Sequence, residues 1–245
     1  MTRRVLALAG AVFADAIRRR IVLAVVLFAA LLTFAIPTLP TYGLGVVTGV
    51  YREVALALTF VGALVLTLAL AANRIPGEIE RRTIYNVAAR PVGRWEYLVG
   101  TWLGIAGVMG AVIAGFTVIE QLLGLLQYGD PMWRLWQGAI AIWMEMGAIA
   151  ALCVAVSAMA GPVVVVVSAL SFMFVAHSKG AVLIDSPSAV TKALYPSLDT
   201  FNIINPVAHG SGVGAQYMAI MLVSFVGWCG LFLLLGTLAF RRRDL

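Results

Sequence analysis

The chain has 245 residues, of which 62% are hydrophobic and only 11% are charged, and its formal net charge is +6. A soluble globular protein carries about 25% charged residues, so the composition excludes an ordinary soluble protein and indicates an integral membrane protein. The positive charge does not indicate binding to nucleic acid, because the arginines are spread over three segments beside apolar stretches.

The first segment, residues 1–18, is predicted to form an amphipathic helix. Its apolar positions recur at helical spacing and are Val5, Ala9, Val12, Phe13 and Ala16. The segment loosely resembles a secretory signal peptide, but the three arginines at 18–20, directly before the next apolar stretch, favour retention in the cytoplasm. We therefore expect an uncleaved helix that lies in the cytoplasmic membrane interface.

Six apolar stretches are each about long enough to cross a bilayer, which takes roughly 20 residues of helix. They cover residues 21–34 (extended to 17–36), 54–72, 97–123, 138–159, 163–176 and 217–240. Backbone groups in lipid must be hydrogen-bonded internally, and the runs lack strand-like alternation, so the spans are expected to be helices. The predicted fold class is all-α, with one polytopic transmembrane domain over residues 1–245.

The arginines set the expected orientation. Thirteen of the seventeen basic residues fall in the N-terminal segment, in the connection between the second and third spans, and in the C-terminal tail. Six spans place these three segments on one side of the membrane. Because cytoplasmic segments carry the excess of positive charge, both termini are predicted to be cytoplasmic.

The connection between the last two predicted spans, residues 177–216, lies on the opposite, outer side. It contains three prolines and several apolar groups, which is too apolar and too short for a separate soluble domain. We expect short helices or re-entrant pieces before the last span. The histidines of this region, His177 and His209, are too far apart to indicate a metal site, and ordinary loop histidines are the preferred interpretation.

The inner connection, residues 73–96, is the most specific local pattern. Pro76 and Glu78 suit the start of a helix, and Pro91 with Gly93 would end one, which predicts a short amphipathic helix over 75–89. Amphipathicity marks a partner surface or the lipid interface without choosing between them. A solvated structural loop is the equally weighted alternative, since pairs such as Glu78 with Arg82 are common on exposed helices.

The stretch GEIERRTIYNVAARPVGRWEYLVGTWLG, residues 77–104, resembles the coupling segment of ABC-2 type transporter permeases. In that family a glutamate-rich turn, a small-residue stretch, an Arg-Pro pair and an aromatic-rich start of the third span follow one another. The tail FRRRDL is similar to the family's cytoplasmic end. The outer stretch PSLDTFNIINPVAHG, residues 196–210, resembles the subgroup for multicopper-enzyme maturation, which includes the nitrous-oxide-reductase accessory transporter. Arg81 and Arg82 depart from the small residues that often follow the glutamates.

The resemblance implies a permease subunit of an exporter in a bacterial inner membrane. Its partners would be two copies of an ATP-binding cassette subunit, a second permease copy (identical or similar), membrane lipids and, in some systems, a periplasmic accessory protein. ATP and magnesium would bind the partner, since this chain lacks the phosphate-binding GxxxxGK[ST] motif. The expected coupling interface comprises Ile75, Glu78, Ile79, Glu80, Arg81 and Arg82. The helix over 1–18 would act as the connecting helix beside it.

Two acidic residues inside predicted spans, Glu120 and Glu145, are candidates for the translocation path. Helix rise places both in the outer half of the membrane. An intramembrane carboxylate is costly and tends to face a cavity or a partner, although a packing role for Glu145 and a headgroup position for Glu120 are the alternatives. If both line an outer vestibule, they would favour cationic or hydrogen-bonding cargo.

Other functional classes are considered on the same residues. A membrane enzyme would need converging catalytic groups, and the spans offer isolated glutamates and serines, so no catalytic residue, metal site or bound cofactor is predicted. An ATP-independent transporter or channel would more often show inverted repeats or broken helices, and neither is evident. That class and a membrane scaffold are kept as alternatives, and the cargo is left open.

Overall fold

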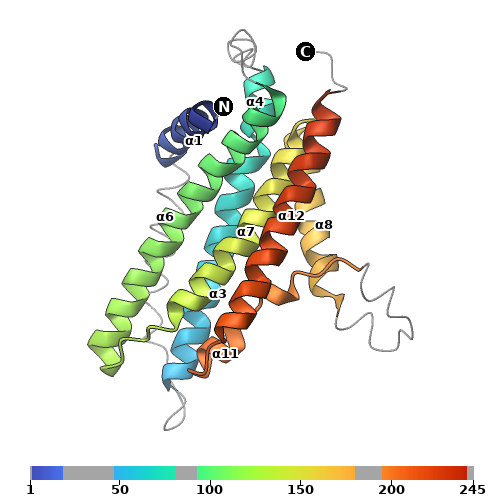
Figure 1. The fold of residues 1–245 in the computed structure, drawn as a ribbon. Coiled ribbons are helices and arrows are strands. Elements are labelled where there is room, and N and C mark those ends of the chain that lie inside the picture. Colours follow the sequence, from blue (N-terminus) through green and yellow to red (C-terminus); the bar gives the residue numbers. More distant parts are fainter. Residues whose placement is uncertain (1, 19–46, 81–92, 180–194, 242–245) are drawn as a thin grey trace.

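The computed structural model describes residues 2–18, 47–80, 93–179 and 195–241, and of residues 78–80 and 241 the backbone alone. These parts are helical and contain no strand (Figure 1). In chain order the elements are α1 Thr2–Ile17, α3 Val47–Ala72, α4 Arg74–Glu80, α6 Arg94–Tyr128, α7 Leu135–Ser157, α8 Pro162–His177, the 3-10 helix η2 Asp199–Phe201, α11 Ile204–Ala208 and α12 Ala215–Arg241.

Four of the described helices are long and apolar enough to cross a membrane: Val47–Gly77, Arg94–Tyr128, Leu135–Ser157 and Ala215–Phe240. They correspond to the second, third, fourth and sixth predicted spans, the fourth of which is predicted to end two residues later, at 159. The fifth predicted span corresponds to α8, which has 16 residues and is therefore only about 24 Å long. The first predicted span, 17–36, lies almost entirely outside the described residues.

Helix α7 is the centre of the bundle. It contacts α3, α6, α8 and α12, and most of its side chains are buried. Two tryptophans bind α6 and α7 to each other, because Trp102 of α6 donates to the carbonyl of Gly147 (2.8 Å) and Trp143 of α7 donates to the carbonyl of Ala106 (2.9 Å). Both rings pack against Phe225 of α12, so one aromatic cluster joins three helices.

Helix α1 packs across the N-terminal half of α6 (Figure 1). The buried residues of α1 are Val5, Val12 and Ala16, three of the predicted apolar positions. The approach is close because glycines of α6 lie under α1: a Cβ at Gly100 would be 2.7 Å from Leu8, and one at Gly104 would be 2.6 Å from Val12. Small residues allow such close packing between helices.

The end of the bundle that holds α1 also holds α4, the start of α6 and the end of α12 (Figure 1). Arg74 of α4 forms an ion pair with Asp15 of α1, and Arg94 at the start of α6 donates to the carbonyl of Phe240 near the end of α12. The ion pair holds α4 against α1. The hydrogen bond connects the first turn of α6 to the last turns of α12.

The opposite end is closed by the loop after α6 and by α11. Arg52 of α3 pairs with Asp130 of that loop and also donates to the carbonyl of Ala208 at the end of α11. Gln137 of α7 exchanges two hydrogen bonds with the backbone of Val213 before α12. The segment from α11 to the start of α12 is thereby held on α3 and α7.

Candidate functional site

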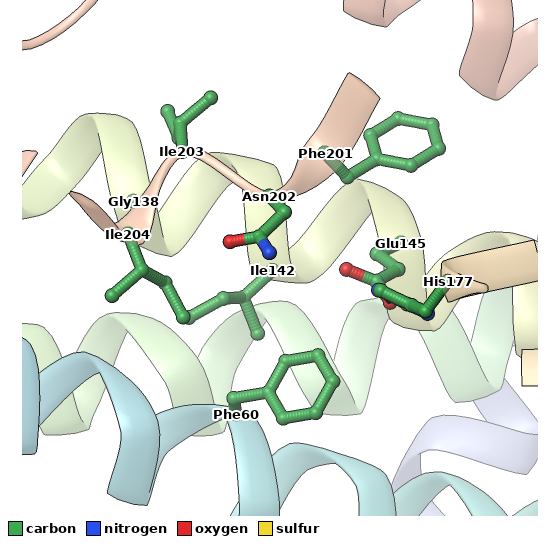
Figure 2. Close-up of a pocket in the computed structure, with 9 residues that line it drawn as sticks. All are labelled: Phe60, Gly138, Ile142, Glu145, His177, Phe201, Asn202, Ile203 and Ile204. Carbon is green, nitrogen blue, oxygen red and sulfur yellow. Dashed lines mark ion pairs between the residues drawn. The ribbon is translucent and has the colours of Figure 1, made fainter. Parts of the chain in front are cut away.

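A cavity of about 190 Å³ lies between α3, α7, the end of α8 and the segment from η2 to α11 (Figure 2). The residues that line it are Phe60, Gly138, Ile142, Glu145, His177, Phe201, Asn202, Ile203 and Ile204. Most of this lining is apolar. The polar side chains in it are one carboxylate, one imidazole and one amide, which is the usual composition of a small-molecule site.

Glu145 comes from the middle of α7 and is only 2% exposed. It lies ten residues after the start of that helix, about 15 Å along it. Its Oε1 atom has no hydrogen-bond partner among the described residues. A buried carboxylate oxygen without a partner costs free energy, and inside a membrane such a group commonly faces a cavity or a partner, as Glu145 does here.

His177 reaches Glu145 because α8 ends beside the middle of α7 (Figure 2). Its Nε2 atom is 3.3 Å from Oε1 of Glu145, within ion-pair range but not aligned for a hydrogen bond. Its Nδ1 atom is 3.0 Å from the carbonyl oxygen of Met173. A carbonyl can only accept, so this contact assigns the proton to Nδ1 and directs Nε2 towards the carboxylate.

The segment after α8 supplies the remaining wall. Phe201 and Ile203 are buried, whereas Asn202 is exposed and directs its amide into the cavity (Figure 2). Asp199 of η2 lies close enough to act electrostatically on Glu145. Tyr217 of α12 donates to the carbonyl of Thr200 (3.0 Å), which fixes this segment to the last helix.

A second hollow of about 570 Å³ adjoins the first and shares Phe60 and His177 with it. Its other lining residues are Leu170, Met173, Phe174 and Ser178 of the α8 region. Phe174 is 77% exposed, so this hollow opens on the outer flank of α8. The carboxylate and imidazole can therefore be approached from the side of the bundle along an apolar surface.

Glu120, the other candidate for the translocation path, lies elsewhere. It is 1% exposed and does not line the cavity. Its Oε1 accepts a hydrogen bond from Thr59 of α3 (2.7 Å), and the hydroxyl of Tyr51 donates to its backbone carbonyl (2.6 Å). The structure thus places Glu120 in the contact between α3 and α6, and it does not bring Glu120 and Glu145 together in one vestibule.

The expected coupling residues are described in part. Helix α4 begins one residue before the predicted helix over 75–89, and residues 81–92, which include Arg81 and Arg82, lie outside the described residues. Of Glu78, Ile79 and Glu80 the structure gives the backbone. Ile75, another of the predicted coupling residues, is completely buried in the structure and packs α4 on the core of the bundle.

Sequence reasoning does not single out the apolar and amide residues of the cavity, and it treats His177 as an ordinary loop residue. The signal in the sequence is weak: the predicted span at 163–176 is short, and a histidine follows it directly. The end of α8 lies at the level of Glu145 because of the way α8 packs on α7, which the sequence does not show. Among the described residues, no group of three or more His, Cys, Asp or Glu side chains could hold a metal ion.

Comparison with protein-family models and with curated proteins finds no match for this sequence.

Proposed function

We propose that this chain is the permease subunit of an ABC-2 type transporter, which exports its cargo and is powered by a separate ATP-binding subunit. In this proposal it forms the translocation path as a dimer in a bacterial inner membrane, with α1, α4 and both termini on the cytoplasmic side. The proposal draws on the residues 77–104 that resemble the coupling segment of that family, and on four helices of membrane-spanning length.

The observation that carries the proposal is the link between α4 and the bundle. Helix α4 follows α3 almost without interruption, since the amide of Gly77 donates to the carbonyl of Asn73 and residues Val47–Gly77 form one span. A force applied to α4 would act on α3, and α3 contributes Phe60 to the cavity. The ion pair between Arg74 and Asp15 extends the same force to α1.

This arrangement suits a subunit that is driven from outside itself. Closure of two ATPase subunits against α4 would tilt α3, and α1 would carry part of the displacement to α6, on which it packs. Packed helices change between discrete arrangements rather than deform continuously. The side of α3 that carries Phe60 would then open or close the cavity beside Glu145.

The test is association with an ATPase. The chain is co-expressed with candidate ATP-binding cassette subunits from the same genome, purified through a tag on the permease, and assayed for ATP hydrolysis. The double substitution Glu78→Ala/Glu80→Ala is expected to reduce co-purification and permease-stimulated hydrolysis by about tenfold, the effect of losing about 1.4 kcal/mol of interaction. Glu53→Ala removes an exposed carboxylate of α3 near the opposite end and is the matched control.

If no ATPase associates with the wild-type chain, the proposal is wrong and an ATP-independent transporter, a channel or a scaffold becomes the better interpretation. An ATPase that associates equally with all three proteins would place the docking surface outside the α4 segment.

A further inference from the structure

The carboxylate of Glu145 lines the cavity and is buried. Its Oε1 atom has no hydrogen-bond partner among the described residues and lies 3.3 Å from Nε2 of His177. A ligand that brings an N–H donor to this carboxylate would recover part of the free energy that its burial costs.

The charges around the cavity favour a cation. Glu145 and, within electrostatic range, Asp199 supply two carboxylates, and His177 is the one lining residue that can carry a positive charge. No lysine or arginine is among the lining residues that the structure describes. The rings of Phe60 and Phe201 also line the cavity, and aromatic faces attract cations.

The surroundings also favour an apolar body. Apart from the three polar side chains, the lining of the cavity is aliphatic or aromatic, and the adjoining hollow of about 570 Å³ is lined mainly by Leu170, Met173 and Phe174. This second hollow reaches the outer flank of α8. A ligand that enters there would keep its apolar part against α8 and bring its head to Glu145.

We infer that the cavity binds an amphiphilic organic ammonium ion, whose N–H groups donate to the carboxylate of Glu145 and whose apolar body lies beside Phe60 against Leu170 and Met173 of α8. The inference excludes an amine that carries a phosphate beside it, because the lining offers that phosphate no lysine or arginine. If the ammonium ion is the cargo, the inference rests on the proposed transport function. Binding of the ion can be measured without an ATPase, so the binding inference and the transport proposal can fail separately.

The test measures binding to the full-length chain in phosphatidylcholine nanodiscs by isothermal titration calorimetry. The probe is 2-phenylethylammonium, and 2-phenylethanol is the uncharged control of the same shape. Wild type is expected to bind the ammonium about 10–100-fold more tightly than the alcohol, the range that a charged hydrogen bond supports. Glu145→Gln is expected to remove this preference, and Glu53→Gln, which changes an exposed carboxylate of α3 that does not line the cavity, is expected to keep it.

A second variant covers the case in which Glu145→Gln does not fold. Asn202 is exposed at the cavity, so Asn202→Lys should fold while placing a tethered ammonium beside Glu145, and it is expected to abolish binding of the probe. Equal affinity for the two probes in wild type, or unchanged ammonium binding in Asn202→Lys, would overturn the inference. Competition by phosphatidylethanolamine in the nanodisc would assign the cavity to a lipid headgroup and overturn the exclusion of phosphate.

Discussion

Replacement of Gly104 by alanine tests how closely α1 is held on α6. The new Cβ would lie 2.6 Å from Cβ of Val12 and 2.7 Å from the carbonyl oxygen of Ala9, whereas carbon atoms in contact are about 3.5–4.0 Å apart. Neither neighbour can rotate away, because one is a backbone atom and the other is attached directly to the backbone. The whole of α1 would have to move outward by about 1 Å.

The size of the effect follows from two opposing terms. Overpacking costs about 1–3 kcal/mol, and contact with a backbone atom places this site in the upper part of that range. Alanine gains about 1 kcal/mol over glycine in helix propensity. The net loss of about 1–2 kcal/mol raises the population of undocked α1 by about 5–30-fold.

Labelling of a buried position on α1 measures this population. Val12→Cys is introduced into a protein in which the two buried native cysteines, Cys153 and Cys229, are replaced by alanine, and its reaction with a maleimide is timed in nanodiscs. The rate is expected to rise by about 5–30-fold with Gly104→Ala. Gly115→Ala is the control, since a Cβ at Gly115 meets nothing within 4 Å. Equal rates in the two variants would refute the close packing of α1 on α6.

Two further substitutions test buried contacts through the unfolding temperature in detergent. Thr59→Val keeps the shape of the side chain but removes the donor to Oε1 of Glu120. It is therefore expected to destabilise the protein by about 1–3 kcal/mol, whereas Thr59→Ser keeps the hydroxyl and should not. Equal unfolding temperatures of the Thr59→Val and Thr59→Ser variants would argue against this hydrogen bond. Gly236→Ala would bring a Cβ to 2.8 Å from the backbone of Ala155 and is expected to lower the unfolding temperature through an overpacking cost of about 1–3 kcal/mol. Gly230→Ala, where a Cβ meets nothing within 4 Å, should have no such effect, and similar behaviour of these two variants would contradict the packing of α12 on α7.

Hydropathy predicts the four described helices of membrane-spanning length, because a long apolar stretch is enough to identify such a helix. It does not predict that α7 is central: a helix face towards lipid is as apolar as a face towards the core, so the exposed α12 and the buried α7 have similar compositions. The glycines of α6 can be read from the sequence, but the packing of α1 on them is visible only in the structure.

The two acidic residues show where the prediction from sequence ends. Helix rise predicts the depth of Glu120 and Glu145 but not the direction in which each side chain faces. Thr59 and Phe60 are neighbours on α3, yet one binds Glu120 and the other lines the cavity beside Glu145. The rotation of each helix therefore separates two carboxylates that the sequence treats alike, and the end point of α8 decides that His177 meets Glu145.

The short length of α8 has a consequence for the surrounding lipid. The hydrocarbon layer of a bilayer is about 30 Å thick, and α8 extends over only about 24 Å. If α8 is one of the spans, as the proposed topology requires, lipid chains along this flank would shorten or tilt, which would thin one side of the membrane next to the protein. Such a local defect would favour short or unsaturated acyl chains, and it would lower the barrier that a polar head must cross between the aqueous phase and the interior.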